Sequence, residues 1–258
     1  MKKPLLDVIF ASDKRKNVLL LLQDGPEQMD TLLKSLETTR TALLPQIRIL
    51  EEHHLVTHDK DTYGLTTVGK LITKEMIPLL DMIDVDIGYW GTHKLDFIPL
   101  HLLQRIGELK ACNLIEVPFH EIFEEDKQFT EKAKKSKSVF TVTSYAFPHF
   151  EKILADLIAN NVSISIIISK ELYGKLIREH FNNTQALIES SSISLHMYPD
   201  SLGFLSLSLN DYSMLFELLT EEGNYDTKKV ICSSDSALHW GKELFQYYLK
   251  NSTPITEL

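Results

Sequence analysis

The chain has 258 residues, 43% of them hydrophobic, and a formal net charge of −9. This length provides for one or two domains, and the hydrophobic content is sufficient for buried cores. No apolar run approaches the roughly 20 residues that span a bilayer, and Asp7 interrupts the apolar stretch near the N-terminus. We therefore exclude membrane-spanning classes and a signal peptide, and expect a cytoplasmic protein with no membrane partner.

The acidic charge is unevenly distributed along the chain. Residues 1–78 carry 11 Lys or Arg and 11 Asp or Glu, so the remainder of the chain supplies the whole −9. Phosphate contacts provide most non-specific affinity for DNA, so an uncharged N-terminal part is expected to bind DNA weakly as a monomer. Two copies on one DNA site would compensate for this weakness.

Two helices are predicted near the N-terminus. An apolar run at residues 18–22 ends at Gly25-Pro26, and a second amphipathic stretch follows at residues 29–36. The short turn between them is typical of a helix-turn-helix.

A third helix is predicted around Pro45. Leu43, Ile47 and Leu50 recur at steps of three and four residues, which places them on one packing face. Proline lacks an amide hydrogen and clashes with the carbonyl four residues earlier, so this helix should begin no earlier than about Thr41.

A short hairpin is predicted directly after that helix. The β-prone residues 55–57 and 63–65 flank the turn-prone residues 59–61. Thr66 or Thr67 is then expected to cap the next helix, because a hydroxyl accepts a hydrogen bond from a first-turn amide. Together these elements predict a winged helix.

A winged helix usually inserts its third helix into the DNA major groove and places its wing on the backbone. Gln46 and Arg48 are predicted to contact bases or phosphates, and Lys60 in the wing a phosphate. The candidate DNA-binding residues are Arg40, Thr41, Ala42, Pro45, Gln46, Arg48, Ile49 and Lys60. The alternative is a winged helix that docks protein instead of DNA.

The middle segment, residues 71–109, has apolar residues at helical spacing and is expected to link the domains and to dimerise. Pro78 should kink its first helix or mark a boundary, and a further helix should begin at His101. The sequence thus predicts a winged-helix domain at 1–70, a helical linker at 71–109 and a regulatory domain at 110–258.

From about Phe129 the pattern becomes α/β. Strands are expected at residues 138–144, 162–169, 193–198, 204–209, 214–218 and 230–232, with helices after the first two and a final helix at 236–249. The last strands lie close together in the sequence, so at least one pair should be antiparallel, which predicts a mixed sheet with helices on its faces.

Ligands of such sheets tend to sit at the carboxyl ends of strands. The candidate effector pocket therefore comprises Ser144, Tyr145, Ser169, Lys170, Tyr198, Ser233 and Ser234. The alternative is that these serines simply cap the following helices.

Four stretches together resemble the FilR-type methanogenesis regulatory proteins of archaea. They are ALLPQIRILEEHHLV at 42–56, YGLTTVGK at 63–70, YWGTHKLDFIPLHLLQRIGEL at 89–109 and ALHWGKELFQYY at 237–248. The resemblance covers nearly the whole chain. It implies a transcriptional regulator that acts as a dimer on DNA, with an N-terminal winged helix joined to an α/β regulatory domain, and it implies no particular effector.

The C-terminal pattern also resembles, more weakly, the phospholipase D-type domain of TrmB-like archaeal regulators. Catalytic members of that superfamily carry a His-x-Lys pair as nucleophile and phosphoryl clamp. Here the corresponding strand reads FLSLSLND, with Leu207 and Leu209 at positions where no side chain attacks or holds a phosphate. A hydrolase on this scaffold is therefore the weaker alternative, and we expect no catalytic residues.

Other chemistry finds little support in the sequence. His53, His54 and His58 straddle a helix end and a strand, where their side chains should diverge, so we expect no metal site. Cys112 and Cys232 belong to no metal-spaced pair, and we expect two reduced, buried thiols with no disulfide and no zinc. We expect no cofactor. The sequence predicts a homodimer on double-stranded DNA, with a small-molecule effector of unidentified chemistry.

Overall fold

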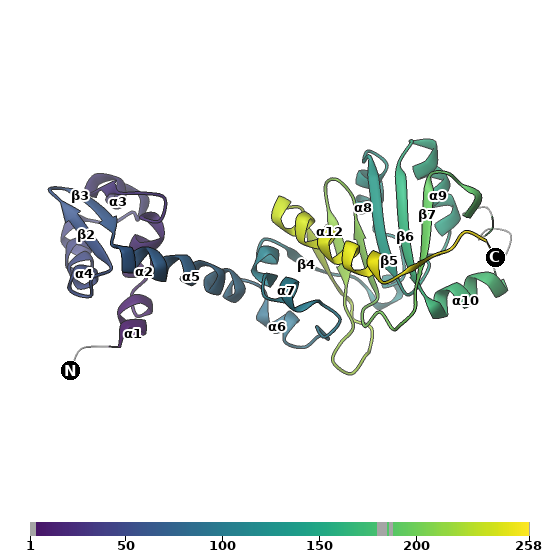
Figure 1. Cartoon of the computed structure of the whole chain (residues 1–258), viewed down its shortest axis with the longest axis horizontal. Coiled ribbons are helices and arrows are strands. Elements are labelled where there is room, and N and C mark those ends of the chain that lie inside the picture. Colours follow the sequence, from purple (N-terminus) through teal and green to yellow (C-terminus); the bar gives the residue numbers. More distant parts are fainter. Residues whose placement is uncertain (1–3, 180–184, 186–187, 258) are drawn as a thin grey trace. The chain divides into compact units, whose positions relative to one another are not determined.

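The computed structural model describes residues 4–179, 185 and 188–257. The chain divides into two compact units, residues 1–80 and 81–258. Figure 1 shows the elements of each unit coloured along the sequence.

The first unit is a winged helix, as predicted. Its helices are α1 (Leu5–Phe10), α2 (Asp13–Leu21), α3 (Met29–Ser35) and α4 (Arg40–Glu52), and its strands are β1 (Glu27–Gln28), β2 (Val56–Asp59) and β3 (Thr62–Leu65). The strands form an antiparallel sheet in the order β1-β3-β2, in which β2 and β3 are the wing. Leu43, Ile47 and Leu50 of α4 are fully buried in the core of this unit, so the predicted packing face is confirmed.

Helix α4 begins at Arg40, with Thr39 as N-cap, one residue earlier than Pro45 suggested. The amides of Ala42 and Leu43 both donate to the carbonyl of Thr39, so the first turn closes ahead of the proline. Pro45 removes the single bond that its own amide would have given to Thr41, and the helix continues past it.

Helix α5 (Thr67–Ile83) follows the wing. The hydroxyl of Thr66 accepts the amide of Gly69 at 2.9 Å, which confirms the predicted cap. A Cβ at Gly69 would lie 2.0 Å from the carbonyl oxygen of Leu55, so this close approach of helix and strand requires glycine.

The second unit contains one eight-stranded sheet. Its strands are β4 (Asn113–Glu116), β5 (Ser138–Thr143), β6 (Ser163–Ser169), β7 (Ile193–Tyr198), β8 (Ser206–Leu209), β9 (Met214–Glu217), β10 (Lys228–Cys232) and β11 (Thr253–Pro254). Its helices are α6 (Ile87–Trp90), α7 (Leu100–Leu103), η1 (Ile106–Leu109), η2 (Phe119–Glu121), α8 (Lys127–Ala133), α9 (Phe150–Ala159), α10 (Lys170–Glu179) and α12 (Asp235–Lys250).

The strand order is β11-β7-β6-β5-β8-β9-β10-β4. Strands β5, β6 and β7 are parallel, whereas β5-β8, β8-β9, β9-β10, β10-β4 and β11-β7 are antiparallel. The predicted mixed sheet is confirmed, while β4 and β11 at its two edges were not predicted.

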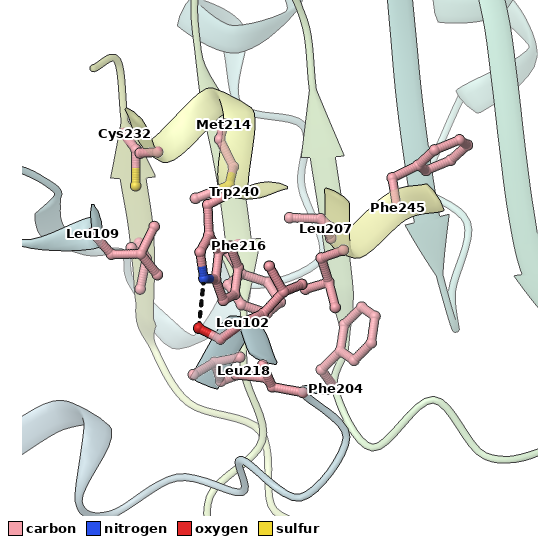
Figure 2. Close-up of a cluster of buried hydrophobic side chains, with 14 of the residues drawn as sticks. Leu102, Leu109, Phe204, Leu207, Met214, Phe216, Leu218, Cys232, Trp240 and Phe245 are labelled. Carbon is pink, nitrogen blue, oxygen red and sulfur yellow. Dashed lines mark hydrogen bonds between the residues drawn. The ribbon is translucent and has the colours of Figure 1, made fainter. Parts of the chain in front are cut away.

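One face of the sheet is covered by α12, drawn in yellow in Figure 1. Trp240, fully buried at the centre of this helix, packs among strand residues such as Met214 and Phe216, and its indole Nε1 donates to the carbonyl of Leu102 at 2.9 Å (Figure 2). The helices α8, α9 and α10 pack on the other face through separate apolar clusters.

The helix predicted from His101 is divided into α7 and η1. The carbonyl of Leu102, which would accept the amide of Ile106 in a continuous α-helix, instead accepts the indole of Trp240 and the amide of Arg105. A contact made by α12 therefore interrupts the helical bonding at this point.

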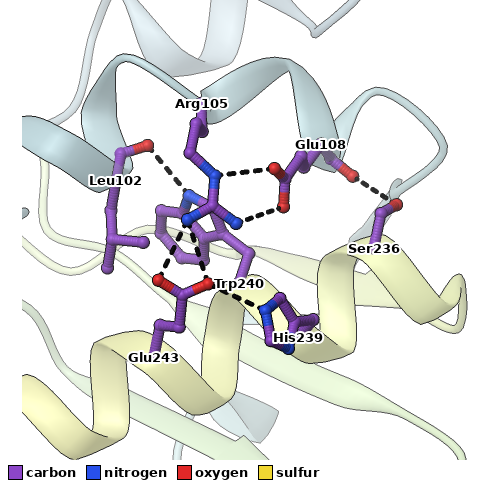
Figure 3. A network of polar contacts seen from close by, with 7 residues as sticks. All are labelled: Leu102, Arg105, Glu108, Ser236, His239, Trp240 and Glu243. Atoms are coloured by element: carbon purple, nitrogen blue, oxygen red, sulfur yellow. Dashed lines mark hydrogen bonds and ion pairs between the residues drawn. The ribbon is translucent and has the colours of Figure 1, made fainter.

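Arg105 fastens this divided segment to α12. Its guanidinium donates to both oxygens of Glu108 and to both oxygens of Glu243, which also pairs with His239 (Figure 3). The hydrogen bonds to the two carboxylates raise the pKa of Arg105 above its ordinary value, so the ion pairs keep a charged guanidinium at neutral pH.

The structure divides the predicted linker at 71–109 between the two units. Residues 71–80 lie in the first unit. Tyr89, Trp90, Ile98 and Leu102 are buried in the core of the second unit. The second part of the segment therefore belongs to the α/β unit, because its apolar side chains pack in the same core as the buried residues of α12.

The expectation of two reduced thiols is wrong, because Cys112 and Cys232 form a disulfide. Cys112 directly precedes β4, and Cys232 ends β10. In the antiparallel register Ile231 lies opposite Asn113, so the two cysteines come next to each other with a Cα separation of 4.4 Å. Their pairing depends on strand register, which their spacing of 120 residues does not reveal.

Among the described residues, no helix is both long and apolar enough to cross a membrane.

Candidate functional site

Helix α4 presents one exposed face. Thr41, Pro45, Arg48 and Glu52 follow one another at steps of four, three and four residues, and all four are exposed. Such spacing places side chains on one side of an α-helix. The structure thus brings three of the predicted DNA-binding residues, Thr41, Pro45 and Arg48, onto one surface.

Gln46 does not belong to this surface. Its side-chain oxygen accepts a hydrogen bond at 2.7 Å from Nη1 of Arg15 on α2. Arg15 is only 8% exposed and also donates to the carbonyl of Val8, so it ties α1, α2 and α4 together. Of the other predicted residues, Ala42 and Ile49 are partly buried, and Ile49 packs against the core. Sequence spacing did not reveal that a buried arginine would engage Gln46.

The wing places one lysine between two acidic residues. Lys60 is exposed at the turn of the hairpin, with a φ of 53°, and lies between Asp59 and Asp61. Asp61 forms a two-pronged ion pair with Arg40, whose pKa it raises through hydrogen bonding and charge attraction. Arg40 is thereby held against the wing, and Asp61 offsets part of its attraction for phosphate.

The three histidines near the wing form no cluster with metal-binding geometry. His58 pairs with Glu51 and stacks on Tyr63 at a ring separation of 5.4 Å. Within the described part of the chain, no group of three His, Cys, Asp or Glu side chains is placed to hold a metal ion.

Several candidates for the effector pocket make structural hydrogen bonds. Ser169 caps α10 by accepting the amide of Leu172 at 3.1 Å, and Ser234 caps α12 in the same way. Ser144 donates to the carbonyl of Leu205 at 3.0 Å. The alternative explanation, helix capping, therefore applies to Ser169 and Ser234.

Strand direction separates the remaining candidates. Strands β5, β6 and β7 are parallel, so Tyr145, Lys170 and Tyr198 follow the carboxyl ends of these strands at the same end of the sheet. Strand β10 runs in the opposite direction, so Ser233 and Ser234, which follow it, lie at the other end of the sheet. Tyr198 makes an edge-to-face ring contact with Tyr248 of α12, on the face opposite the helices α8–α10. The seven predicted residues do not form one pocket.

A cavity of about 120 Å³ lies instead between the sheet and the helices α8, α9 and α10. Of the seven candidates, Tyr145 lines it, together with apolar side chains from the three helices and from residues 145–150. Its floor includes the hydroxyl-bearing residues Thr141, Thr143, Ser206 and Ser208 on the adjacent strands β5 and β8. In the sequence, these residues stand at every second position of two central strands. The prediction did not use this pattern, which could have indicated a polar strip on one face of the sheet.

A buried ion pair supports one end of this floor. Lys229 Nζ lies 2.7 Å from Glu217 Oε1, and both residues are 3% exposed. Glu217 Oε2 accepts the hydroxyls of Tyr145 at 2.9 Å and of Ser206 at 2.5 Å, and Lys229 also donates to the carbonyl of Ile122. Burial and the neighbouring Glu217 carboxylate raise the pKa of Tyr145, so its phenol remains a hydrogen-bond donor.

Comparison with known proteins gives two family matches. Residues 4–84 match the N-terminal domain of the methanogenesis regulatory protein FilR1, and residues 122–251 match the middle domain of the same protein. The methanogenesis regulatory protein FilR1 of Methanothrix harundinacea (strain 6Ac) is 24% identical over 261 residues. That alignment covers 96% of this chain but 58% of the relative, so the chain spans less than two thirds of the relative's length.

Two solved structures are similar at lower levels. TrmBL2, an archaeal chromatin protein, gives a TM-score of 0.45 at 14% identity and 97% coverage of both chains. Nuc from Salmonella typhimurium, a phospholipase D family member, gives a TM-score of 0.42 at 12% identity, covering 57% of this chain and 98% of that one. Both TM-scores are below 0.5.

Proposed function

Because the chain belongs to the family of the methanogenesis regulatory protein FilR1, we propose that it is a transcriptional regulator that binds double-stranded DNA through its winged helix. Helix α4 enters the major groove, and the wing lies on the adjacent backbone. The observation that carries this proposal is the exposed face of α4, on which Thr41, Pro45 and Arg48 stand free of the packing face.

Arg48 is the principal contact in this proposal. Arginine binds the guanine edge or a phosphate with two hydrogen bonds, and Arg48 is exposed two thirds of the way along α4. Gln46 acts indirectly, because it orients Arg15 and thereby the packing of α2 against α4. Lys60 contributes one phosphate contact from the wing.

We further propose that the regulator works as a homodimer in the cytoplasm. The winged-helix part carries no net charge, so a second copy would supply the affinity that one copy lacks. On α5, Leu71 is 62% exposed and Leu79 is 47% exposed, and apolar side chains in such a position favour a helix-helix contact. Light scattering on Leu71→Glu should then show loss of the dimer.

The α/β unit is proposed to sense an effector and to lack catalysis. Leu207 and Leu209 occupy the strand positions at which a phospholipase D-type enzyme would need its reactive pair. Both are fully buried against the α12 face, where they pack in the core. The alternating Ser206 and Ser208 face the cavity instead.

The DNA proposal is tested by selecting bound fragments from a random duplex library with the full chain. We expect enrichment of a palindromic site and a loss of binding in Arg48→Ala. Arg178→Ala is the matched control, because Arg178 is an exposed arginine on α10 of the other unit. Absence of any enriched site, or equal binding by Arg48→Ala and Arg178→Ala, would refute the proposal and favour a protein-docking winged helix.

A further inference from the structure

The two faces of the α/β sheet are packed differently. The α12 face forms one continuous apolar cluster. The opposite face carries two clusters, one around Ala133 and Leu157 and another around Leu172 and Leu195, and the cavity is lined by residues of both. Protein interiors are otherwise close-packed, and unfilled space in a core lowers stability. Ile166 packs against both clusters, and a small molecule in the cavity would add further contacts between them.

The size of the cavity limits its occupant. Its volume of about 120 Å³ is of the same order as the engineered apolar cavity of about 150 Å³ that binds benzene. The occupant therefore has one ring or a short branched alkyl group.

The floor of the cavity provides a polar anchor. The hydroxyls of Thr141 and Ser208 lie 3.2 Å apart and share one hydrogen bond. Among the described residues, neither hydroxyl has another hydrogen-bond partner. Two hydroxyls carry two donors and four lone pairs, so one mutual bond engages one donor and one lone pair. The pair can donate to and accept from a ligand hydroxyl or carbonyl.

The ionisable residues of the lining exclude an anion. They are the carboxylates of Glu125 and Asp126 and the phenol of Tyr145, none of which carries a positive charge, and Asp126 already caps α8 by accepting the amide of Phe129. Among the residues that the structure describes, no basic side chain belongs to the lining. A carboxylate or phosphate in this apolar space would lose its hydration with no cation to replace it.

Residues 145–150 separate the cavity from an outer depression. Tyr145 and Phe147 line both hollows, and the depression is edged by the exposed rings of Phe123 and Tyr225. Tyr145 packs against Phe123 and Phe147, and its hydroxyl is fixed by Glu217. This aromatic group therefore forms part of the wall between the cavity and the surface depression.

We propose that the cavity binds a small uncharged molecule with an aromatic or branched alkyl body and one hydroxyl or carbonyl group, which hydrogen-bonds to Thr141 and Ser208. The assignment of this molecule as the effector rests on the proposed regulatory function. The binding itself does not, because it depends on the second unit alone.

Calorimetry on the full chain, without DNA, tests this with benzyl alcohol, toluene and sodium benzoate as probes. Ligands of this size are expected to bind with a Kd on the order of 1 mM. We expect benzyl alcohol to bind more tightly than toluene, and benzoate to show no binding. Ser208→Ala should weaken benzyl alcohol by about five-fold and leave toluene unchanged, since it removes one hydrogen bond.

Two variants act as controls. Ser194→Ala changes an exposed serine on β7 of the same sheet and should leave all three affinities unchanged. Ala133→Leu fills the cavity from α8 and should abolish binding of both neutral probes. If Ala133→Leu does not fold, the proposal is tested by Ser208→Ala alone. In that variant the ratio of benzyl alcohol affinity to toluene affinity should fall by about five-fold.

Three results would overturn the proposal. They are no binding of benzyl alcohol, binding of benzoate as tight as that of benzyl alcohol, and an unchanged ratio in Ser208→Ala. Each leaves the DNA proposal standing, because that proposal is measured on Arg48 and on selected duplexes. Failure of DNA binding likewise leaves the cavity result intact.

Discussion

Replacing Lys229 with Met should destabilise the α/β unit strongly. Lys229→Met retains most of the length of the side chain and removes its charge. Glu217, which is 3% exposed, would then retain the hydroxyls of Tyr145 and Ser206 as donors but no cation. An ionised carboxylate left in this position carries its desolvation cost without the ion pair that offsets it.

The expected magnitude follows from that burial. Removing one partner of a buried ion pair costs about 3–5 kcal/mol. Glu217→Gln in the Lys229→Met background retains an oxygen that accepts from Tyr145 and Ser206, and it removes the unpaired charge. We therefore expect the double variant to be more stable than Lys229→Met alone, by about 2 kcal/mol, which makes the two changes strongly non-additive.

Urea unfolding followed by tryptophan fluorescence measures this effect in the correct unit. The chain has two tryptophans, Trp90 and Trp240, and both are buried in the core of the α/β unit. With an m-value of about 2–3 kcal/mol/M, the midpoint of Lys229→Met should fall by about 1–2.5 M. Lys228→Met, an exposed neighbour on β10, is the control. A loss below about 1 kcal/mol, or additive single and double variants, would refute this account of the ion pair.

Three further predictions concern packing and ionisation. Ala133→Leu, which places three carbons in the cavity, should raise the free energy of unfolding by about 0.5–2 kcal/mol, and a loss of stability in the urea assay would show that the space is already filled. Gly69→Ala should unfold the winged helix at lower temperature, as measured by circular dichroism, because its Cβ would meet the Leu55 carbonyl at 2.0 Å; an unchanged transition would mean that α5 shifts freely. Burial raises the pKa of Tyr63 and Tyr198, and it raises those of Tyr89, Tyr145 and Tyr248 by far more. The prediction concerns the last three. Because these pKa values are raised, their contribution to stability is complete below about pH 10 and is lost above it. A spectrophotometric titration should therefore show three of the nine tyrosines ionising only on unfolding, and ionisation of all nine in the folded protein would contradict this.

Periodicity in the sequence predicted most elements of the fold. Leu43, Ile47 and Leu50 identified the packing face of α4 because burial follows the helical repeat. Alternating or β-branched runs such as residues 163–169 identified the central strands. Such periodic patterns are local, because each helix or strand is indicated by the residues of that element alone.

The missed features depend on contacts between distant segments. The disulfide follows from the register of β10 with β4, and the division of the helix after Leu102 follows from the indole of Trp240. The candidate pocket grouped the carboxyl ends of strands within a sheet that was expected to be mixed, and the sequence did not indicate which strands reverse. Strand β10 runs opposite to β5, β6 and β7, which places Ser233 and Ser234 at the other end of the sheet. None of these pairings is specified by spacing along the chain.

The same limit applies to the proposed DNA-binding face. The sequence assigned Gln46 to the exposed side, and its position in the helical repeat did not reveal that Arg15 would engage it. Arg48 and Pro45 were placed correctly on the exposed face, since helical spacing alone decides that.

The salt dependence of DNA binding by Arg48→Ala tests the central proposal most directly. Fluorescence anisotropy on a selected duplex, measured over a range of salt concentrations, gives the slope of log affinity against log salt. If Arg48 contacts a phosphate, its removal should reduce that slope by about 1; if it contacts a base, binding should weaken by about 1–3 kcal/mol with loss of sequence preference. Arg178→Ala should change neither quantity. Wild-type slope, affinity and sequence preference in Arg48→Ala would contradict the proposal that α4 is the DNA-recognition helix.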